Sequence, residues 1–143
     1  MTMIWKRAYS LDQINKFSEQ TMVSHLGIEF TAVGEDFLEA RMPVDHKTVQ
    51  PMRLLHGGAS VALAETLGST AALLCIEEGI NKAPVGVEIN ANHMRSVTKG
   101  WVTGKVTPLK IGRTLHVWQI KIYDEKENLV CVSRLTIAVV DQR

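Results

Sequence analysis

The sequence predicts an α+β domain in which a curved antiparallel sheet of about six strands wraps round one long central helix. Three observations predict this class. Residues 59–76 are apolar on nearly every side, which is typical of a buried helix. Two short extended segments precede this stretch and four follow it. The turns between successive strands are short, which favours antiparallel pairing, and only a sheet that curls can surround one helix.

The expected elements follow local signals along the chain. Ser10 and Gln13 match a capping box before the first helix, Pro43 ends the second strand, and Pro108 ends the fourth. Alternating or continuous apolar residues indicate the remaining strands. In order, we expect a helix over 11–19, strands over 28–33 and 37–42, the central helix over 59–76, and strands over 85–92, 101–107, 114–123 and 129–140.

Size and composition limit the possible functions. The 143 residues contain no linker or repeat, so we predict a single domain over 1–143. With 45% hydrophobic and 22% charged residues, the chain is globular rather than disordered. The net charge of +1 excludes a chain-wide electrostatic grip on nucleic acid or on an acidic membrane surface.

Cellular location is predicted from the cysteines and the apolar segments. Cys75 and Cys131 lie in apolar runs, as reduced core thiols do. The first residues contain no signal-peptide core, and the apolar stretch over 59–76 is interrupted by Glu65 and several small polar residues. We therefore expect a cytoplasmic protein with no membrane-spanning helix.

Val85, Val87, Ile89 and Ala91 alternate with more polar residues along the third expected strand. The expected sheet as a whole also bears on the assembly. One chain cannot cover both the outer face and the edges of its own sheet, so apolar residues there would be stranded. We expect at least a dimer.

Glu65 is the unusual residue of the central helix, because acidic side chains are rarely buried without a partner. Two interpretations remain open. Glu65 is a functional carboxylate, or it lies on the solvated stripe of the helix or in a salt bridge to a distant arginine. Ser69 lies four residues on and shares the face of Glu65, although packing alone explains a small residue there.

His56, Gly57 and Gly58 immediately precede the apolar helix. Glycines at a helix start leave backbone N–H groups accessible, and the partial positive charge there favours an oxygen that develops negative charge. Each donor in such an oxyanion hole contributes roughly 3 kcal/mol to transition-state stabilisation. The alternative is a tight turn with a histidine cap. Glu65 lies roughly 10–12 Å along the helix from Gly57, so if both serve one reaction centre, one of them comes from another subunit.

Other chemistry has weaker support. The five histidines lack metal-ligand spacing, and neither a phosphate-binding loop nor a serine nucleophile elbow occurs, so no metal site is expected. Basic residues gather around the strand that follows the helix: Arg95, Lys99, Lys105, Lys110 and Arg113. They form either a solvated sheet face or a docking patch for a phosphorylated carrier.

Four segments together carry a specific resemblance: Gln50-Pro51, Leu55 to Ser60, Ala64-Glu65, and Glu88 to His93. They resemble the hotdog-fold acyl-CoA thioesterases, in particular the enterobacterial-type branch that acts on aromatic thioesters. The resemblance runs from Ile4 to the final strand. It implies dimers with continuous sheets, and usually homotetramers built as dimers of dimers.

The resemblance also implies a reaction. An acyl-CoA thioester that carries an aromatic group, such as 1,4-dihydroxy-2-naphthoyl in menaquinone biosynthesis or benzoyl, or a medium-chain group, is hydrolysed to the free acid and CoA. Coenzyme A is then part of the substrate, and no cofactor is needed. The alternatives are proofreading on aryl carrier proteins, an acyl-thioester dehydratase or hydratase, and a non-catalytic acyl-CoA sensor.

The same resemblance implies residue roles. Glu65 attacks the thioester carbonyl or activates water, Gly57 of the partner subunit holds the carbonyl oxygen, Gln50 and His56 orient the thioester, and Ser69 orients the water or the acyl ring. The positions matching the coenzyme A site are Gly86, His93, Met94, Arg95, Ser96, Lys110, Ile111, Gly112, Arg113, Thr114 and Leu115. The sequence departs from the family pattern at Met52-Arg53 and at Thr70, so the acyl preference is left open.

Overall fold

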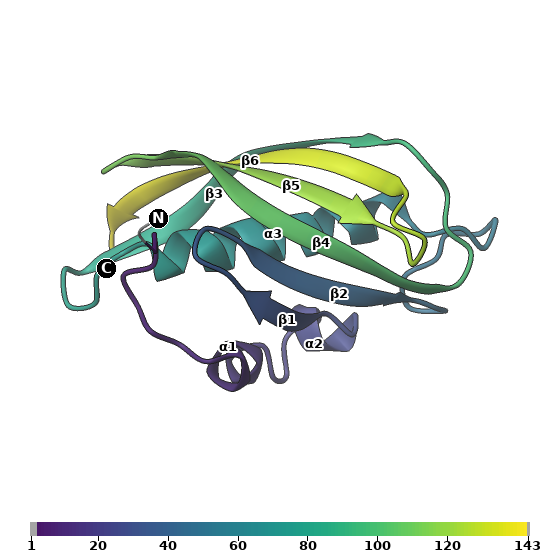
Figure 1. Ribbon diagram of the computed structural model, residues 1–143, viewed down its shortest axis with the longest axis horizontal. Helices are drawn as coiled ribbons and strands as arrows, with labels where there is room; N and C mark the ends of the chain where they lie inside the picture. Colours follow the sequence, from purple (N-terminus) through teal and green to yellow (C-terminus); the bar gives the residue numbers. More distant parts are fainter. Residues whose placement is uncertain (1–2, 143) are drawn as a thin grey trace.

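A computed structural model describes residues 3–142 and confirms the predicted fold class: a six-stranded antiparallel sheet curves round one long helix (Figure 1). The strands lie in the order β1-β2-β4-β5-β6-β3. Their bounds are β1 (Glu29–Val33), β2 (Leu38–Val44), β3 (Lys82–His93), β4 (Gly100–Ile111), β5 (Leu115–Tyr123) and β6 (Leu129–Asp141). The helices are α1 (Leu11–Phe17), α2 (Met22–His25) and α3 (Gly57–Leu74).

The core lies between α3 and the concave face of the sheet. Leu63 and Leu67 of α3 are fully buried, as are Trp118 and Ile120 of β5. Gly104 of β4 allows the helix to approach closely, because a Cβ there would lie 2.6 Å from Cδ1 of Leu67. This packing fixes the depth of α3 in the sheet, and with it the position of every side chain that the helix carries. No helix in residues 3–142 has the length and hydropathy needed to cross a membrane.

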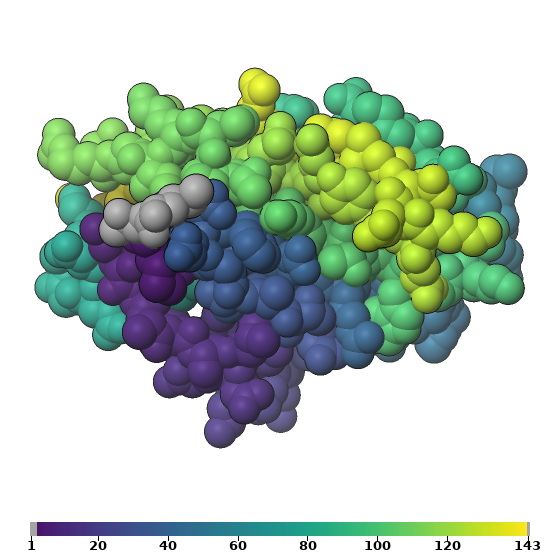
Figure 2. Space-filling model, in the orientation of Figure 1, coloured from purple at the N-terminus to yellow at the C-terminus, as the bar shows by residue number. Residues whose placement is uncertain are grey.

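The N-terminal segment packs on the opposite edge of the sheet from β3. The predicted capping box is confirmed: the Ser10 hydroxyl accepts from the Gln13 N–H at 3.2 Å, and the Gln13 side chain accepts from the Ser10 N–H at 2.9 Å. The Asn15 side chain donates to the Phe30 carbonyl at 3.0 Å and accepts from the Phe30 N–H at 2.8 Å. This segment, purple in Figure 2, lies against the blue strands. The four-residue helix α2 was not predicted.

Two strand ends that were predicted from prolines are wrong. Strand β2 continues through Pro43, and β4 continues through Pro108. Strand β1 pairs with β2 only as far as Arg41 of β2, and β2 pairs with β4 only as far as Val106 of β4. Each proline therefore lies beyond the end of the neighbouring strand on one side. A proline at such a position removes no ladder hydrogen bond, so the strand can continue through it.

The expected alternation along β3 is also wrong at one point. Gly86 lies opposite Ile137 and Glu88 lies opposite Thr136, so Val87 is an extra residue in a β-bulge. The bulge shifts the face pattern by one residue. Val85 and Val87 therefore do not continue the face that carries Ile89 and Ala91.

Through His116, the stability of the protein is expected to depend on pH. His116 is 2% exposed, its Nδ1 has no partner within the residues that the structure describes, and its ring meets Trp118 edge-on at 5.8 Å. Burial lowers the pKa of this imidazole, although a backbone hydrogen bond at Gly112 partly opposes the shift. The unfolded chain binds a proton near pH 6.5 and the folded chain binds it only at lower pH.

The free energy of unfolding should therefore fall as the pH drops below about 6.5, by at most about 1.4 kcal/mol per pH unit for this group. Urea unfolding of the native protein and of His116→Gln at pH 7.5 and 5.5, at equal protein concentration, measures the effect. The native protein should lose more stability than the variant over this interval. Equal losses in both proteins would show that His116 does not carry the effect.

Candidate active site

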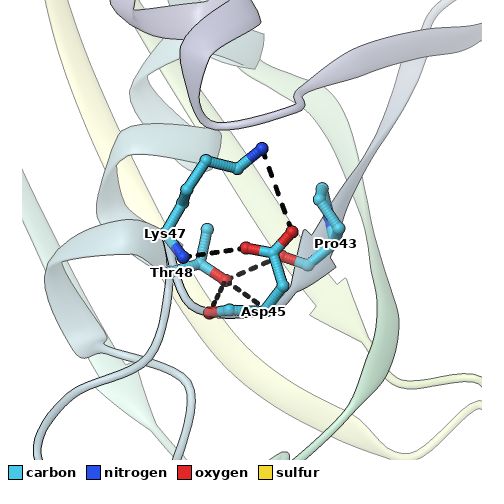
Figure 3. A network of polar contacts seen from close by, with 4 residues as sticks. All are labelled: Pro43, Asp45, Lys47 and Thr48. Atoms are coloured by element: carbon cyan, nitrogen blue, oxygen red, sulfur yellow. Dashed lines mark hydrogen bonds and ion pairs between the residues drawn. The ribbon is translucent and has the colours of Figure 1, made fainter.

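A short turn after β2 positions the loop that leads into α3 (Figure 3). The buried Thr48 hydroxyl donates to the Pro43 carbonyl at 2.7 Å and accepts from the Asp45 N–H at 3.0 Å. The Asp45 carboxylate accepts from the Lys47 N–H at 2.9 Å. The Thr48 carbonyl in turn accepts from the His56 N–H at 2.8 Å. The turn therefore holds the residue that caps the central helix.

The start of α3 leaves one amide free. His56 is the N-cap, and its Nδ1 accepts from the Gly58 N–H at 2.8 Å. The N–H groups of Ala59 and Ser60 donate to the His56 carbonyl at 3.0 and 3.2 Å. Within residues 3–142, the Gly57 N–H has no acceptor. The sequence left open whether His56 caps the helix or the glycine amide is accessible to a ligand. In the described residues, both are found.

A cavity of about 340 Å³ opens beside this amide. Its lining comes from the loop before α3, the first turn of α3, and the end of β3 with the residues that follow: Gln50, Leu54, Leu55, Gly57, Ser60, His93, Met94, Arg95, Ser96 and Val130. The His93 imidazole lies directly against Gly57, since a Cβ on Gly57 would be 2.9 Å from its Nε2. The structure thus brings predicted catalytic residues together with four of the predicted coenzyme A residues.

The side chain of Gln50 is oriented so that its NH₂ group can donate a hydrogen bond to a ligand. Its side-chain oxygen already accepts a hydrogen bond from the Met52 N–H, so its NH₂ group is the part left to contact a ligand. Arg53 follows in the left-handed region at φ 68°, a conformation that favours glycine. At the departure from the family pattern, Met52-Arg53, a residue other than glycine therefore adopts a conformation that favours glycine.

Glu65 lies two turns further along α3 and is partly buried. Among the residues described, its carboxylate makes no ion pair, so the salt bridge to a distant arginine does not form. The carboxylate lies over β3, where a Cβ on Gly86 would be 2.5 Å from Oε2. Ser69, on the next turn, is also partly exposed. Eight residues of continuous helix put Glu65 about 12 Å from Gly57, as the sequence predicted.

The remaining predicted coenzyme A positions lie elsewhere in the chain. The turn between β4 and β5, with the Gly112 N–H donating to the Leu115 carbonyl at 2.8 Å, lies at the end of the fold where α3 ends (Figure 1). Ile111, Gly112 and Arg113 line a separate cavity of about 240 Å³. Cys75 also borders this cavity, but burial raises the pKa of its thiol to about 12, so it is not a thiolate nucleophile. In one chain, the predicted coenzyme A positions therefore line two separate cavities.

Sequence reasoning missed four cavity residues: Leu54, Leu55, Ser60 and Val130. The place of Ser60 in the cavity could have been predicted, because Ser60 lies three residues after Gly57 and therefore on the same side of the helix. The sequence near Val130 contains no comparable signal. Val130 belongs to β6, and only the sheet order brings it to this end of α3.

A sheet curled round a helix, with a free amide at the start of that helix and an unpaired carboxylate two turns on, defines a hotdog-fold enzyme that acts on thioesters. The comparisons agree with this class. The chain belongs to the Thioesterase superfamily, which matches residues 52–131. It is a thioester hydrolase.

Relatives with this fold span nearly the whole chain. A 1,4-dihydroxy-2-naphthoyl-CoA hydrolase from Escherichia coli is 54% identical over 96% of this chain and 100% of its own. The proofreading thioesterase EntH from Cronobacter turicensis is 53% identical over 96% and 99%. A thioesterase structure from Haemophilus influenzae superposes with a TM-score of 0.94 at 54% identity, covering 97% of this chain and 96% of its own.

Proposed function

We propose that this protein hydrolyses acyl-CoA thioesters with aromatic or medium-chain acyl groups to the free acid and coenzyme A. The observation that carries the proposal is the free Gly57 amide at the N-terminus of α3, open to the cavity that Gln50 and His93 also line. A carbonyl oxygen placed there gains an N–H donor and the partial positive charge of the helix end, both of which stabilise developing negative charge.

The chemistry needs a base or a nucleophile on the other side of the carbonyl, and Glu65 is our candidate. In the general-base route, water gives a proton to the Glu65 carboxylate while its oxygen bonds to the carbonyl carbon. The carbonyl oxygen becomes negative and is held by the Gly57 N–H. Collapse of this intermediate breaks the C–S bond, and the proton passes to the departing thiolate.

In the covalent route, the Glu65 carboxylate attacks the carbonyl, expels the thiolate and forms an anhydride that water then hydrolyses. A single turnover in ¹⁸O-labelled water tests the covalent route. Label in the Glu65 side chain requires the anhydride, whereas label in the released acid alone follows from the general base or from attack of water on the acyl carbonyl of the anhydride.

Because Gly57 and Glu65 are about 12 Å apart in one chain, the proposed site takes Gly57 from one subunit and Glu65 from a second copy. The coenzyme A half-sites fit the same arrangement. His93 to Ser96 of one subunit and the turn from Lys110 to Leu115 of the partner subunit would hold one coenzyme A. We expect dimers, assembled in pairs into tetramers.

Mixing two inactive variants tests the shared site. Glu65→Gln and Gly57→Pro subunits each lack one half, but a mixed dimer contains one site with both native residues. Random reassortment yields half mixed dimers, each with one of its two sites intact, so about a quarter of native activity should return. Separately purified variants that are not reassorted are the control. No recovery in verified mixed dimers would place the whole site within one chain.

The acyl group and its carrier are tested by ranking kcat/KM for thiol release from a panel of acyl-CoA and aryl-carrier thioesters. The names of the two relatives favour 1,4-dihydroxy-2-naphthoyl-CoA, an intermediate in menaquinone synthesis, with carrier proofreading as the second candidate. The same assay separates hydrolysis from hydration, which would consume an enoyl thioester without thiol release. Cys75 and Cys131 are free thiols, which supports our placing the reaction in the reducing cytoplasm.

A further inference from the structure

The turn between β5 and β6 lies beside the segment that follows β3 (Figure 1). An ion pair joins the two: Oδ2 of Asp124, the first residue of the turn, lies 3.6 Å from Nε of Arg95. Arg95 lines the cavity beside the Gly57 amide, whereas Asp124 lies outside that lining. Asp124 therefore reaches the proposed site through the Arg95 side chain.

The Asp124 carboxylate is held firmly by its own turn. Oδ1 accepts from the N–H groups of Lys126 and Asn128 at 2.9 Å each, and Oδ2 accepts from the Asn128 side-chain amide at 3.0 Å. The side chain is only 15% exposed. The hydrogen bonds, that from the Asn128 side chain first, lower the pKa of Asp124, so the carboxylate is ionised at neutral pH. Arg95 therefore faces a fixed negative charge.

The Arg95 side chain needs such a support. Its backbone is anchored, because the Met94 N–H donates to the Val130 carbonyl at 2.8 Å and the Leu55 N–H donates to the Val97 carbonyl at 2.8 Å. The side chain itself is 58% exposed. A long exposed side chain samples many rotamers, and it loses that freedom when it binds a ligand. The ion pair at Nε restricts these rotamers before a ligand arrives.

The ion pair leaves the other end of the guanidinium available. Within residues 3–142, neither Nη group of Arg95 forms an ion pair. Two parallel N–H groups match two oxygens of a phosphate, and such a contact depends on the orientation of the guanidinium. Both substrates under consideration carry phosphate, in the nucleotide and pantetheine arm of coenzyme A or in the phosphopantetheine arm of a carrier protein. This step rests on the proposed function.

We propose that Asp124 is a positioning residue, which holds the Arg95 guanidinium so that its two Nη groups face a phosphate of the thioester substrate. Asp124 acts on substrate binding and not on the chemical step. Its carboxylate also repels the phosphate, but the two lie at opposite ends of the guanidinium, and salt screens exposed charges at such separations. Orientation of the Nη groups therefore outweighs the repulsion.

Asp124→Asn tests the proposal. Asparagine keeps the size of the side chain and an oxygen that accepts from the turn amides, but its neutral amide forms no ion pair with Arg95. KM for acyl-CoA should rise about 2- to 10-fold, the factor that corresponds to ordering one long side chain on binding, with kcat little changed. Hydrolysis of S-acyl-pantetheine, which carries no phosphate, should be unaffected. Acyl-dephospho-CoA and acyl-carrier thioesters then identify the phosphate, because the effect disappears with a substrate that lacks it.

Two further variants separate positioning from a general structural effect. Glu29→Gln is the matched control, because it removes the carboxylate from another exposed arginine pair, 3.2 Å from Arg41 at the opposite edge of the sheet, and KM should stay unchanged. Arg95→Gln should raise KM, and adding Asp124→Asn to it should have no further effect. An unchanged or lower KM in Asp124→Asn, an equal effect on S-acyl-pantetheine, or additive effects in the double variant would overturn the proposal.

Binding of coenzyme A, measured by calorimetry, requires no hydrolysis and keeps this proposal separate from the proposed function. If Glu65→Gln hydrolyses thioesters normally while Asp124→Asn binds coenzyme A more weakly than the native protein, the proposed mechanism fails and the positioning role stands. If hydrolysis depends on Glu65 but Asp124→Asn binds coenzyme A as the native protein does, the positioning role fails and the proposed function stands.

Discussion

Glu65→Gln is expected to lower kcat for acyl-CoA hydrolysis by at least about 100-fold, the usual scale for loss of a catalytic acid–base group. Glutamine keeps the size and hydrogen-bonding capacity of the side chain, but it can neither accept a proton from water nor act as a carboxylate nucleophile. The substituted side chain still fits over Gly86, where the carboxylate lies now. The loss should therefore appear in kcat, measured as thiol release from benzoyl-CoA, with little change in the affinity for substrate.

The control is Glu19→Gln, which removes an exposed carboxylate outside the site and should leave kcat unchanged. Binding of acyl-CoA to Glu65→Gln, measured by calorimetry, distinguishes an enzyme from a sensor. An enzyme variant binds without turnover, whereas a non-catalytic sensor has no turnover in the native protein either. A kcat within a few-fold of native would remove Glu65 from the mechanism.

Gly57→Pro is expected to lower kcat about 100- to 1,000-fold relative to Gly57→Ala, the range found when one oxyanion donor is removed. Proline removes the N–H and adds a ring whose Cβ lies where the alanine Cβ would lie. Gly57 is the first residue of α3, where proline is favoured because its missing N–H has no helical partner. His56, with φ −68° and ψ 130°, already has the extended conformation that a following proline requires.

Gly57→Ala is the matched control because it adds the same Cβ against the His93 ring while keeping the N–H. That Cβ would lie 2.9 Å from Nε2, so the imidazole must shift, and Gly57→Ala reports the cost of this shift alone. Circular dichroism and sedimentation should show that both variants fold and assemble alike. Equal kcat values for proline and alanine would mean that the Gly57 amide does not hold the carbonyl oxygen.

The two substitutions act on one reaction centre, so their effects should not add. When Glu65→Gln has removed the base or nucleophile, little catalysis remains for the Gly57 amide to stabilise, and the double variant should lose much less than the product of the two factors. Independent losses would indicate that the two groups serve different steps.

Local sequence signals predicted most of the elements, because each depends on neighbours within a few residues. The capping box at Ser10 and the apolar stretch that forms α3 are of this kind. The errors arose where pairing with strands distant in the sequence determines where a strand ends or bulges. Pro43 and Pro108 did not end their strands because the adjacent strand was already absent at those positions. The bulge at Val87 is visible only in the pairing of β3 with β6.

Some features of the candidate site also follow from the local sequence, and others follow only from the tertiary structure. The sequence by itself determined that a lone carboxylate and a glycine-led helix start are about 12 Å apart on one helix, because helical rise is a local constant. Only the tertiary structure decided that His93 covers Gly57, that Gly86 lies under Glu65, and that the predicted coenzyme A positions line two separate cavities. These relations join residues far apart in the chain, and the order in which the strands pair sets them.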